Sequence, residues 1–145
     1  MLIVILACVS LIASTTAIHY EALRLVNAAL PSLGIPNRTK VLVVIFAAFA
    51  AHALEIAVYG ATVFVLVKHF GLGSLAGTAG FSFLNCRYFS AETYTSLGFG
   101  DLTPVGPVRL LAGVEALNGL VLIGWSASYT YIAMERFWNT EGTHR

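Results

Sequence analysis

The sequence predicts an all-α membrane protein with three transmembrane helices and one shorter, re-entrant helix. Of its 145 residues, 58% are hydrophobic and only 10% are charged, whereas about 25% of the residues of a soluble domain are charged. The mean hydropathy of +0.82 also indicates that lipid surrounds most of the surface. The length is that of a single domain. Apolar residues are concentrated in four stretches, which cover residues 1–18, 41–67, 81–95 and 108–134.

The first apolar stretch predicts an extra N-terminal helix over residues 1–30. A spanning helix needs about 20 apolar residues at about 1.5 Å each, and Tyr20 can extend this short stretch to the membrane interface. No basic residue precedes the apolar run, which argues against a cleaved signal peptide, so we expect this helix to be retained. Its placement, around the outside of its own chain or on a neighbouring chain, stays open.

The second and fourth stretches are long enough to cross a membrane with tilt to spare. They predict an outer helix over residues 41–69 and an inner helix over residues 107–135. The third stretch is too short to span, so we expect a re-entrant helix over residues 82–94. Because the sequence shows no internal repeat, one chain supplies one such segment. The connection before it is expected to be flexible, since it contains Gly71, Gly73, Gly77 and Gly80.

Basic residues divide unevenly between the two sides of the predicted membrane. One side carries Arg24, Arg38, Lys40, Arg136 and Arg145. The other side carries Lys68, Arg87 and Arg109. The positive-inside rule places the larger group in the cytoplasm. We therefore expect a multi-pass protein of the cell membrane, with the N-terminus outside and the C-terminus cytoplasmic. The sequence contains no basic cluster, so we expect no nucleic acid partner.

The run Thr-Ser-Leu-Gly-Phe-Gly-Asp at residues 95–101 is the most informative motif. It follows the re-entrant helix and precedes the inner helix. Gly98 and Gly100 alternate with Leu97 and Phe99, and glycine adopts left-handed backbone conformations at little cost. Such alternation can point successive backbone carbonyls to one side. Gly-x-Gly-Asp alone is common in turns. A run of seven ordered residues between a re-entrant helix and a spanning helix is much more specific than a turn signal.

Residues 89–105, which contain this run, resemble the potassium channel pore family. That family's pore helix and filter usually read T-x-T-T-V/I-G-Y/F-G-D, and the likeness extends over about residues 41–136. It is greatest to small bacterial members with a bare pore, which implies the bacterial inner membrane. The departures are Ser96 for threonine and Phe99 for tyrosine. Both replacements keep the oxygen atoms that would face the axis of the pore. The tyrosine hydroxyl is absent, which is expected to alter the rigidity of the filter.

The resemblance implies a tetrameric, potassium-selective channel in which the re-entrant helix is a pore helix. Backbone carbonyls of four identical chains would replace the water around a K+ ion. K+ is expected at Ser96, Leu97, Gly98 and Phe99, with Gly100 completing the selectivity filter. K+ is the permeant ligand, and no cofactor is expected. The expected partners are three further copies of the chain and membrane lipids.

Several residues are expected to support the filter. Thr95 lies at its inner end, and Glu92 is expected to form a strut with Asp101 behind it, as in similar bacterial channels. Two close carboxylates cannot both ionise easily, so one pKa should rise. The alternative for Glu92 is an ordinary ion pair with Arg87 or Arg109.

The inner helix carries two glycines and an apolar stripe. Gly119 and Gly124, which with Arg109 match the family's spacing, are expected to act as hinges. Close helix packing explains Gly119 equally well. Helical spacing places on one face a stripe that is expected to line the cavity: Ala116, Leu120, Ile123, Ala127 and Tyr131.

Ionisable residues inside the predicted spans are expected to be paired, because unpaired ones are costly in a membrane. Glu115, one turn from Asn118, is expected to pair with His52 or with hydroxyls of the pore helix. His52 and Glu55 form a His-x-x-Glu pair that could in principle bind metal, but the sequence shows no third ligand.

We therefore expect passive, selective conduction of dehydrated K+ ions. A weakly selective cation channel and a non-conducting accessory membrane subunit stay open as alternatives. An enzyme is the least expected class, because no nucleophile–base arrangement, zinc-protease motif or nucleotide loop is present in the sequence.

Overall fold

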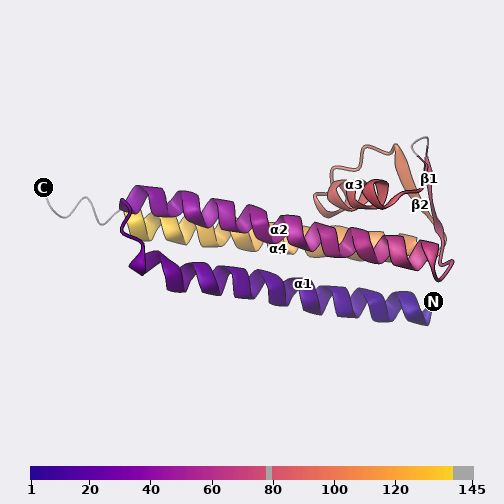
Figure 1. Cartoon of the computed structure of the whole chain (residues 1–145), viewed down its shortest axis with the longest axis horizontal. Coiled ribbons are helices and arrows are strands. Elements are labelled where there is room, and N and C mark those ends of the chain that lie inside the picture. The colour runs from indigo at the N-terminus through magenta and orange to yellow at the C-terminus, as the bar shows by residue number, and fades with distance from the viewer. Residues whose placement is uncertain (78–79, 139–145) are drawn as a thin grey trace, which may run out of the picture.

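The computed structural model of the chain describes residues 1–77 and 80–138. Three long helices lie side by side in it, namely α1 (Leu2–Ala29), α2 (Asn37–Lys68) and α4 (Val108–Trp138) (Figure 1). Each is long and apolar enough to cross a membrane, which confirms the expected all-α membrane architecture. The remaining elements are the short turn η1 (Leu30–Ser32), strand β1 (Ser74–Gly77), helix α3 (Phe83–Tyr94) and strand β2 (Leu102–Val105).

Helix α1 packs against α2 and α4 of its own chain. Its buried residues recur every three or four positions and therefore occupy one face: they are Val4, Cys8, Leu11, Thr15, His19 and Leu23. The opposite face leaves large apolar side chains exposed, including Leu2, Leu6 and Val9. Such a helix, covered by protein on one face and apolar on the other, suits a lipid boundary. Within the one chain that the structure describes, α1 covers its own α2 and α4, and its placement relative to a neighbouring chain stays a prediction.

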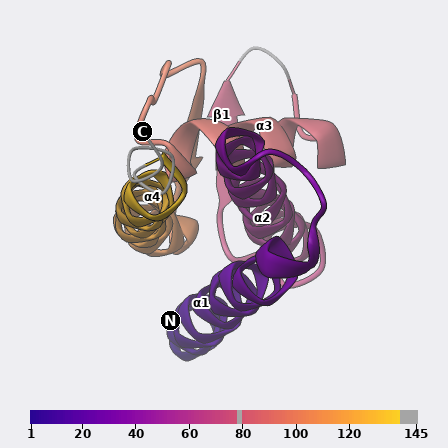
Figure 2. The same ribbon diagram turned by 90° about the vertical axis from the view of Figure 1, so that its left-hand side faces the viewer.

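The elements divide between the two ends of the bundle. Helix α3, both strands and the N-terminal end of α1 lie at one end, while η1 and the C-terminal end of α4 lie at the other (Figure 1). Viewed along the bundle, α3 lies across α2 and α4, on the side away from α1 (Figure 2). Ser82 is the N-cap of α3, since its hydroxyl accepts a hydrogen bond from the Asn85 amide at 3.1 Å.

The connection before α3 contains a strand, which differs from the flexible segment that its glycines suggest. β1 pairs antiparallel with β2, so that Ser74 lies opposite Val105 and Gly77 lies opposite Leu102. A Cβ at Gly73 would lie 2.3 Å from the carbonyl oxygen of Val105. Glycine is needed there for the close approach of two backbones, and not for mobility. The strands thus tie the segment before α3 to the segment after residue 101.

The interior has two apolar clusters with polar side chains between them. One cluster joins α1, α2, α3 and α4 at the end that carries α3, and includes Leu11, Tyr59 and Phe89. The other joins η1, α2 and α4 at the far end, and includes Leu30, Val44 and Phe137. Buried polar residues lie between the two apolar clusters, and they include His19, Glu55, Asn118 and Ser126.

Candidate functional site

Residues 95–101 leave the C-terminal end of α3 in a backbone of alternating hand. Ser96, Gly98 and Gly100 have positive φ angles of 57°, 55° and 80°, whereas Leu97 and Phe99 do not. Within the described residues, Ser96 is the one non-glycine residue with positive φ. A side chain in this region is unusual and commonly marks a functional constraint. The sequence suggests left-handed positions at the two glycines, but gives no sign that Ser96 shares them.

The amides of this loop are turned back towards α3. The N–H of Thr95 donates to the carbonyl of Ala91 at 3.2 Å, and that of Ser96 donates to the carbonyl of Thr93 at 2.9 Å. The Thr95 hydroxyl also donates to the Ala91 carbonyl at 2.8 Å. The donors at the start of the loop are therefore satisfied by the helix that precedes them.

Glu92 holds the next three amides. Its carbonyl oxygen accepts the N–H of Leu97 at 2.9 Å and that of Gly98 at 3.2 Å. Its Oε2 accepts the N–H of Phe99 at 3.1 Å. In the described part of the chain, no hydrogen bond is donated to a carbonyl of residues 96–100. The loop thus presents a run of carbonyl oxygens without partners among the described residues, while the amides of residues 95–99 are all bonded to α3.

Glu92 and Asp101 occupy the space beside this loop. Burial raises the pKa of the Glu92 carboxyl, the Phe99 amide opposes that rise, and the neighbouring Asp101 raises the pKa further. Tyr88, one helical turn before Glu92, donates its hydroxyl to Asp101 Oδ1 at 3.3 Å. No ion pair joins Glu92 to an arginine among the described residues, so the alternative pairing with Arg87 or Arg109 is not found. Tyr88 is a residue that the sequence analysis missed.

The predicted stripe lies on the side of α4 that the rest of the chain leaves uncovered. Leu120 is 54% exposed and Tyr131 is 62% exposed, while Ile123 and Ala127 border a cavity between α2 and α4. Ala116 is half-buried and borders a hollow shared with Ser96, Gly98 and Gly100. The opposite side of α4 packs on the chain itself through Glu115, Asn118, Leu122 and Ser126.

Gly119 lies where α4 passes closest to the end of α3. A Cβ at this position would lie 2.1 Å from the carbonyl oxygen of Tyr94. Gly124 has open space where its Cβ would be, and α4 runs as one helix through both glycines. The packing role of Gly119 is therefore visible in the structure, and the hinge roles of both glycines stay predictions.

The buried ionisable residues pair across helices. Glu115 accepts a hydrogen bond from the hydroxyl of Ser90 in α3, which is one of the two expected pairings. The other expected partner, His52, lies instead beside Glu55, the Tyr94 hydroxyl and Ser126. His19 of α1 joins this group at 3.0 Å from Glu55 Oε1. No sequence pattern indicates the contact between His19 and Glu55, because it joins residues far apart in the chain.

Comparison with known proteins agrees with this geometry. The sequence model of a family described as "Ion channel" matches residues 39–136, which include most of α2, all of α3 and the loop, and most of α4. Over 56 residues the chain is 36% identical to the inward rectifier potassium channel Kirbac3.1 of Paramagnetospirillum magnetotacticum. That match covers 38% of this chain and 19% of the relative, so the chain spans only a small part of that protein's length. No solved structure matches.

Proposed function

Because the chain belongs to the ion channel family whose model covers residues 39–136, we propose that four copies of it form a potassium-selective pore. The similarity to a potassium channel supports K+ as the permeant ion. The three apolar helices support a multi-pass membrane protein. Conduction is passive and needs no cofactor, because the energy comes from the ion gradient alone.

One observation carries the proposal: among the residues that the structure describes, the carbonyls of residues 96–100 have no hydrogen-bond partner, while the amides of residues 95–99 are bonded to α3. A dehydrated cation needs several oxygen ligands at once, and rings of backbone carbonyls supply them in potassium filters. The alternating φ angles at Ser96, Gly98 and Gly100 allow successive carbonyls to face one axis. K+ is then held at Ser96, Leu97, Gly98 and Phe99, with Ser96 adding its hydroxyl.

The single chain leaves the surfaces that a tetramer would cover. Leu97 is 60% exposed and Phe99 is 66% exposed, although both are large and apolar. On α4, Leu120, Ile123, Ala127 and Tyr131 are exposed within the chain, and Ala116 is half-buried. Four chains around one axis bury the two loop side chains against neighbouring copies and turn the stripe towards a central cavity. Apolar patches of this kind usually mark interaction sites.

The surrounding residues fit the same arrangement. Helix α3 is the re-entrant pore helix, and Glu92, Tyr88 and Asp101 brace the filter from behind. The end of the bundle with α3 and the N-terminus faces outward, since the first turn of α2, at the other end, carries Arg38 and Lys40.

Reconstitution of the purified protein in lipid bilayers tests this function. With K+ on one side and Na+ on the other, a potassium-selective pore gives a reversal potential close to the K+ equilibrium value. A reversal potential near zero favours the weakly selective channel, and a folded tetramer without current favours the accessory subunit.

Two alanine substitutions, one in the filter and one outside it, test whether the current depends on the filter backbone. Gly98→Ala places a side chain at φ 55° in the filter and is expected to abolish the current. Gly113→Ala in α4 has open space and helical geometry, so it is expected to conduct like the unaltered protein. Equal currents from both variants would contradict the proposed filter.

A further inference from the structure

Three side chains of the kinds that bind metal ions meet in the middle of the bundle. His19 comes from α1, and His52 and Glu55 come from neighbouring turns of α2; we call these three residues the histidine cluster. His19 and Glu55 have no exposed side-chain surface, and His52 retains 16%. One nitrogen or oxygen atom from each lies within 4.8 Å of the other two. Helix α1 thus supplies the third ligand that the His-x-x-Glu pair lacks in the sequence.

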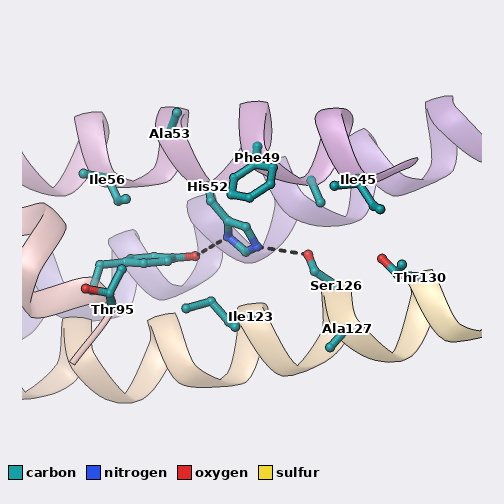
Figure 3. A pocket seen from close by; sticks show the side chains of 12 residues that line it. Ile45, Phe49, His52, Ala53, Ile56, Thr95, Ile123, Ser126, Ala127 and Thr130 are labelled. Atoms are coloured by element: carbon teal, nitrogen blue, oxygen red, sulfur yellow. Dashed lines mark hydrogen bonds between the residues drawn. The ribbon is translucent and has the colours of Figure 1, made fainter. Parts of the chain in front are cut away.

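The two imidazoles lie between the same two oxygen-bearing side chains. On one side, His19 Nδ1 is 3.0 Å from Glu55 Oε1, and His52 Nδ1 is 3.1 Å from Glu55 Oε2. On the other side, His19 Nε2 is 3.2 Å and His52 Nε2 is 3.0 Å from the hydroxyl oxygen of Ser126 in α4. Figure 3 shows the contact between His52 and Ser126. Both Nδ1 atoms converge on one carboxylate, and both Nε2 atoms converge on one hydroxyl.

The hydrogen atoms of this arrangement do not balance for an ionised glutamate and two neutral histidines. An ionised carboxylate only accepts hydrogen bonds, so for both imidazoles to bond to Glu55 both Nδ1 atoms must carry hydrogen. The Tyr94 hydroxyl, which donates to the same Oε2, supplies no hydrogen to the contact between His52 and Glu55. Both Nε2 atoms are then acceptors, yet Ser126 has a single hydrogen to donate. One Nε2 therefore faces the Ser126 oxygen with no hydrogen between them. One more positive charge, carried by a proton or a metal ion, completes the cluster.

We propose that the histidine cluster binds a divalent transition-metal ion of the zinc class through both Nδ1 atoms and the Glu55 carboxylate. Zinc bonds of about 2.0–2.1 Å place neighbouring ligand atoms of a tetrahedral site about 3.3 Å apart. The separations of 3.0 and 3.1 Å, which run to the two oxygens of Glu55, are close to this value, and no two ligand atoms of the set lie more than 4.8 Å apart. With Nδ1 on the metal, both Nε2 atoms carry hydrogen and donate to the two lone pairs of Ser126. Ligating histidines are usually held by such a bond.

Tyr94, the last residue of α3, occupies the place of a fourth ligand. Its hydroxyl oxygen is 3.0 Å from His52 Nδ1 and contacts Glu55 Oε2. On binding, the Tyr94 hydroxyl releases its proton to solvent, and the phenolate and the Glu55 carboxylate together neutralise the divalent ion, so the complex is neutral in the low-dielectric interior. The ion then joins α1 and α2 to the residue that directly precedes Thr95 and the loop.

A cavity provides access to this position. About 520 Å³ of space lies between α2 and α4, bordered by His52, Tyr94 and Ser126 and otherwise mostly by apolar side chains (Figure 3). Metal binding does not depend on the proposed potassium conduction. The site can therefore be tested on the purified protein without any measurement of current.

The experiment measures zinc bound to the full chain in detergent after a chelator has removed all metal. We expect one zinc ion per chain and a higher Tm with zinc. We expect Co2+ in place of zinc to give the visible absorption of a four-coordinate site. His19→Gln is expected to weaken zinc binding about 100-fold or more, and Ser126→Ala about 10- to 100-fold. His69→Gln, exposed at the end of α2, is the matched control and should bind zinc like the unaltered protein.

Three results would overturn the proposal. A folded protein that takes up no zinc shows that a proton completes the cluster. Equal zinc binding by His19→Gln and the unaltered protein shows that the metal binds elsewhere. If His19→Gln fails to fold, the unaltered protein decides: a Co2+ spectrum that is absent or six-coordinate contradicts a site made by these ligands.

Discussion

Oε2 of Glu92 lies 3.1 Å from the backbone nitrogen of Phe99 and accepts its hydrogen. The carbonyl oxygen of the same glutamate accepts two preceding amides of the loop. One residue of α3 therefore fixes the donors of three consecutive loop residues and leaves their carbonyls free. A change in the protonation or identity of Glu92 acts directly on the proposed filter.

The first prediction concerns pH. The folded protein raises the pKa of Glu92 above its ordinary value of 4.5, so folding favours the protonated carboxyl. The stabilisation from this group is present in full below pH 4.5 and is lost as the pH rises through the folded pKa. Glu92→Gln is uncharged at all pH values and should remove this part of the pH dependence. Thermal unfolding of both proteins from pH 4 to pH 9 measures it, and parallel curves would refute the claim.

The second prediction concerns Gly119. Gly119→Ala forces a methyl group into the Tyr94 carbonyl, and such overpacking typically lowers the free energy of unfolding by about 1–3 kcal/mol. Gly124→Ala meets open space and should be neutral or stabilise by up to about 1 kcal/mol. Denaturant unfolding compares the two. If Gly119→Ala keeps full stability and alters only the open probability, a hinge role replaces the packing role.

The third prediction separates the backbone of Ser96 from its hydroxyl. Ser96→Ala and Ser96→Gly both remove the hydroxyl, but only alanine keeps a side chain at φ 57°. Ser96→Gly should therefore be more stable than Ser96→Ala by about 1–2 kcal/mol. Both should carry less K+ current than the unaltered protein, to a similar extent. Full current in either variant would show that the hydroxyl is not an ion ligand.

The fourth prediction concerns the predicted cavity lining. Ile123→Cys should react with a water-soluble thiol reagent applied from the cytoplasmic side, because Ile123 is 37% exposed and borders the cavity between α2 and α4. Leu122→Cys is its control, since Leu122 is only 1% exposed. The natural cysteines, Cys8 and Cys86, are both buried and should react slowly. Equal labelling at positions 122 and 123 would rule out the assigned face.

The sequence could predict the features that depend on local pattern. Apolar length identified the long helices, and the outer helix expected over residues 41–69 compares with Asn37–Lys68 in the structure. The alternation of Gly98 and Gly100 with larger residues indicated left-handed positions, which both glycines have. These signals work because helix length and glycine conformation are properties of short segments.

Features that join distant segments could not be predicted in the same way. His19 meets Glu55 because α1 folds back on α2, and no spacing in the sequence encodes that contact. The pairing of β1 with β2 was missed because each strand has only four residues and a glycine-rich border. Of the two partners expected for Glu115, the structure shows the pore-helix hydroxyl of Ser90, whereas His52 contacts Tyr94 and Ser126 instead.

Ion density from a structure determined in K+ and again in Na+ tests the central claim most directly. We predict four chains around one axis, with separate K+ peaks on that axis beside the carbonyls of residues 96–100. Sodium should leave a different or weaker pattern. A monomer, or a loop whose carbonyls point away from any shared axis, would contradict the account.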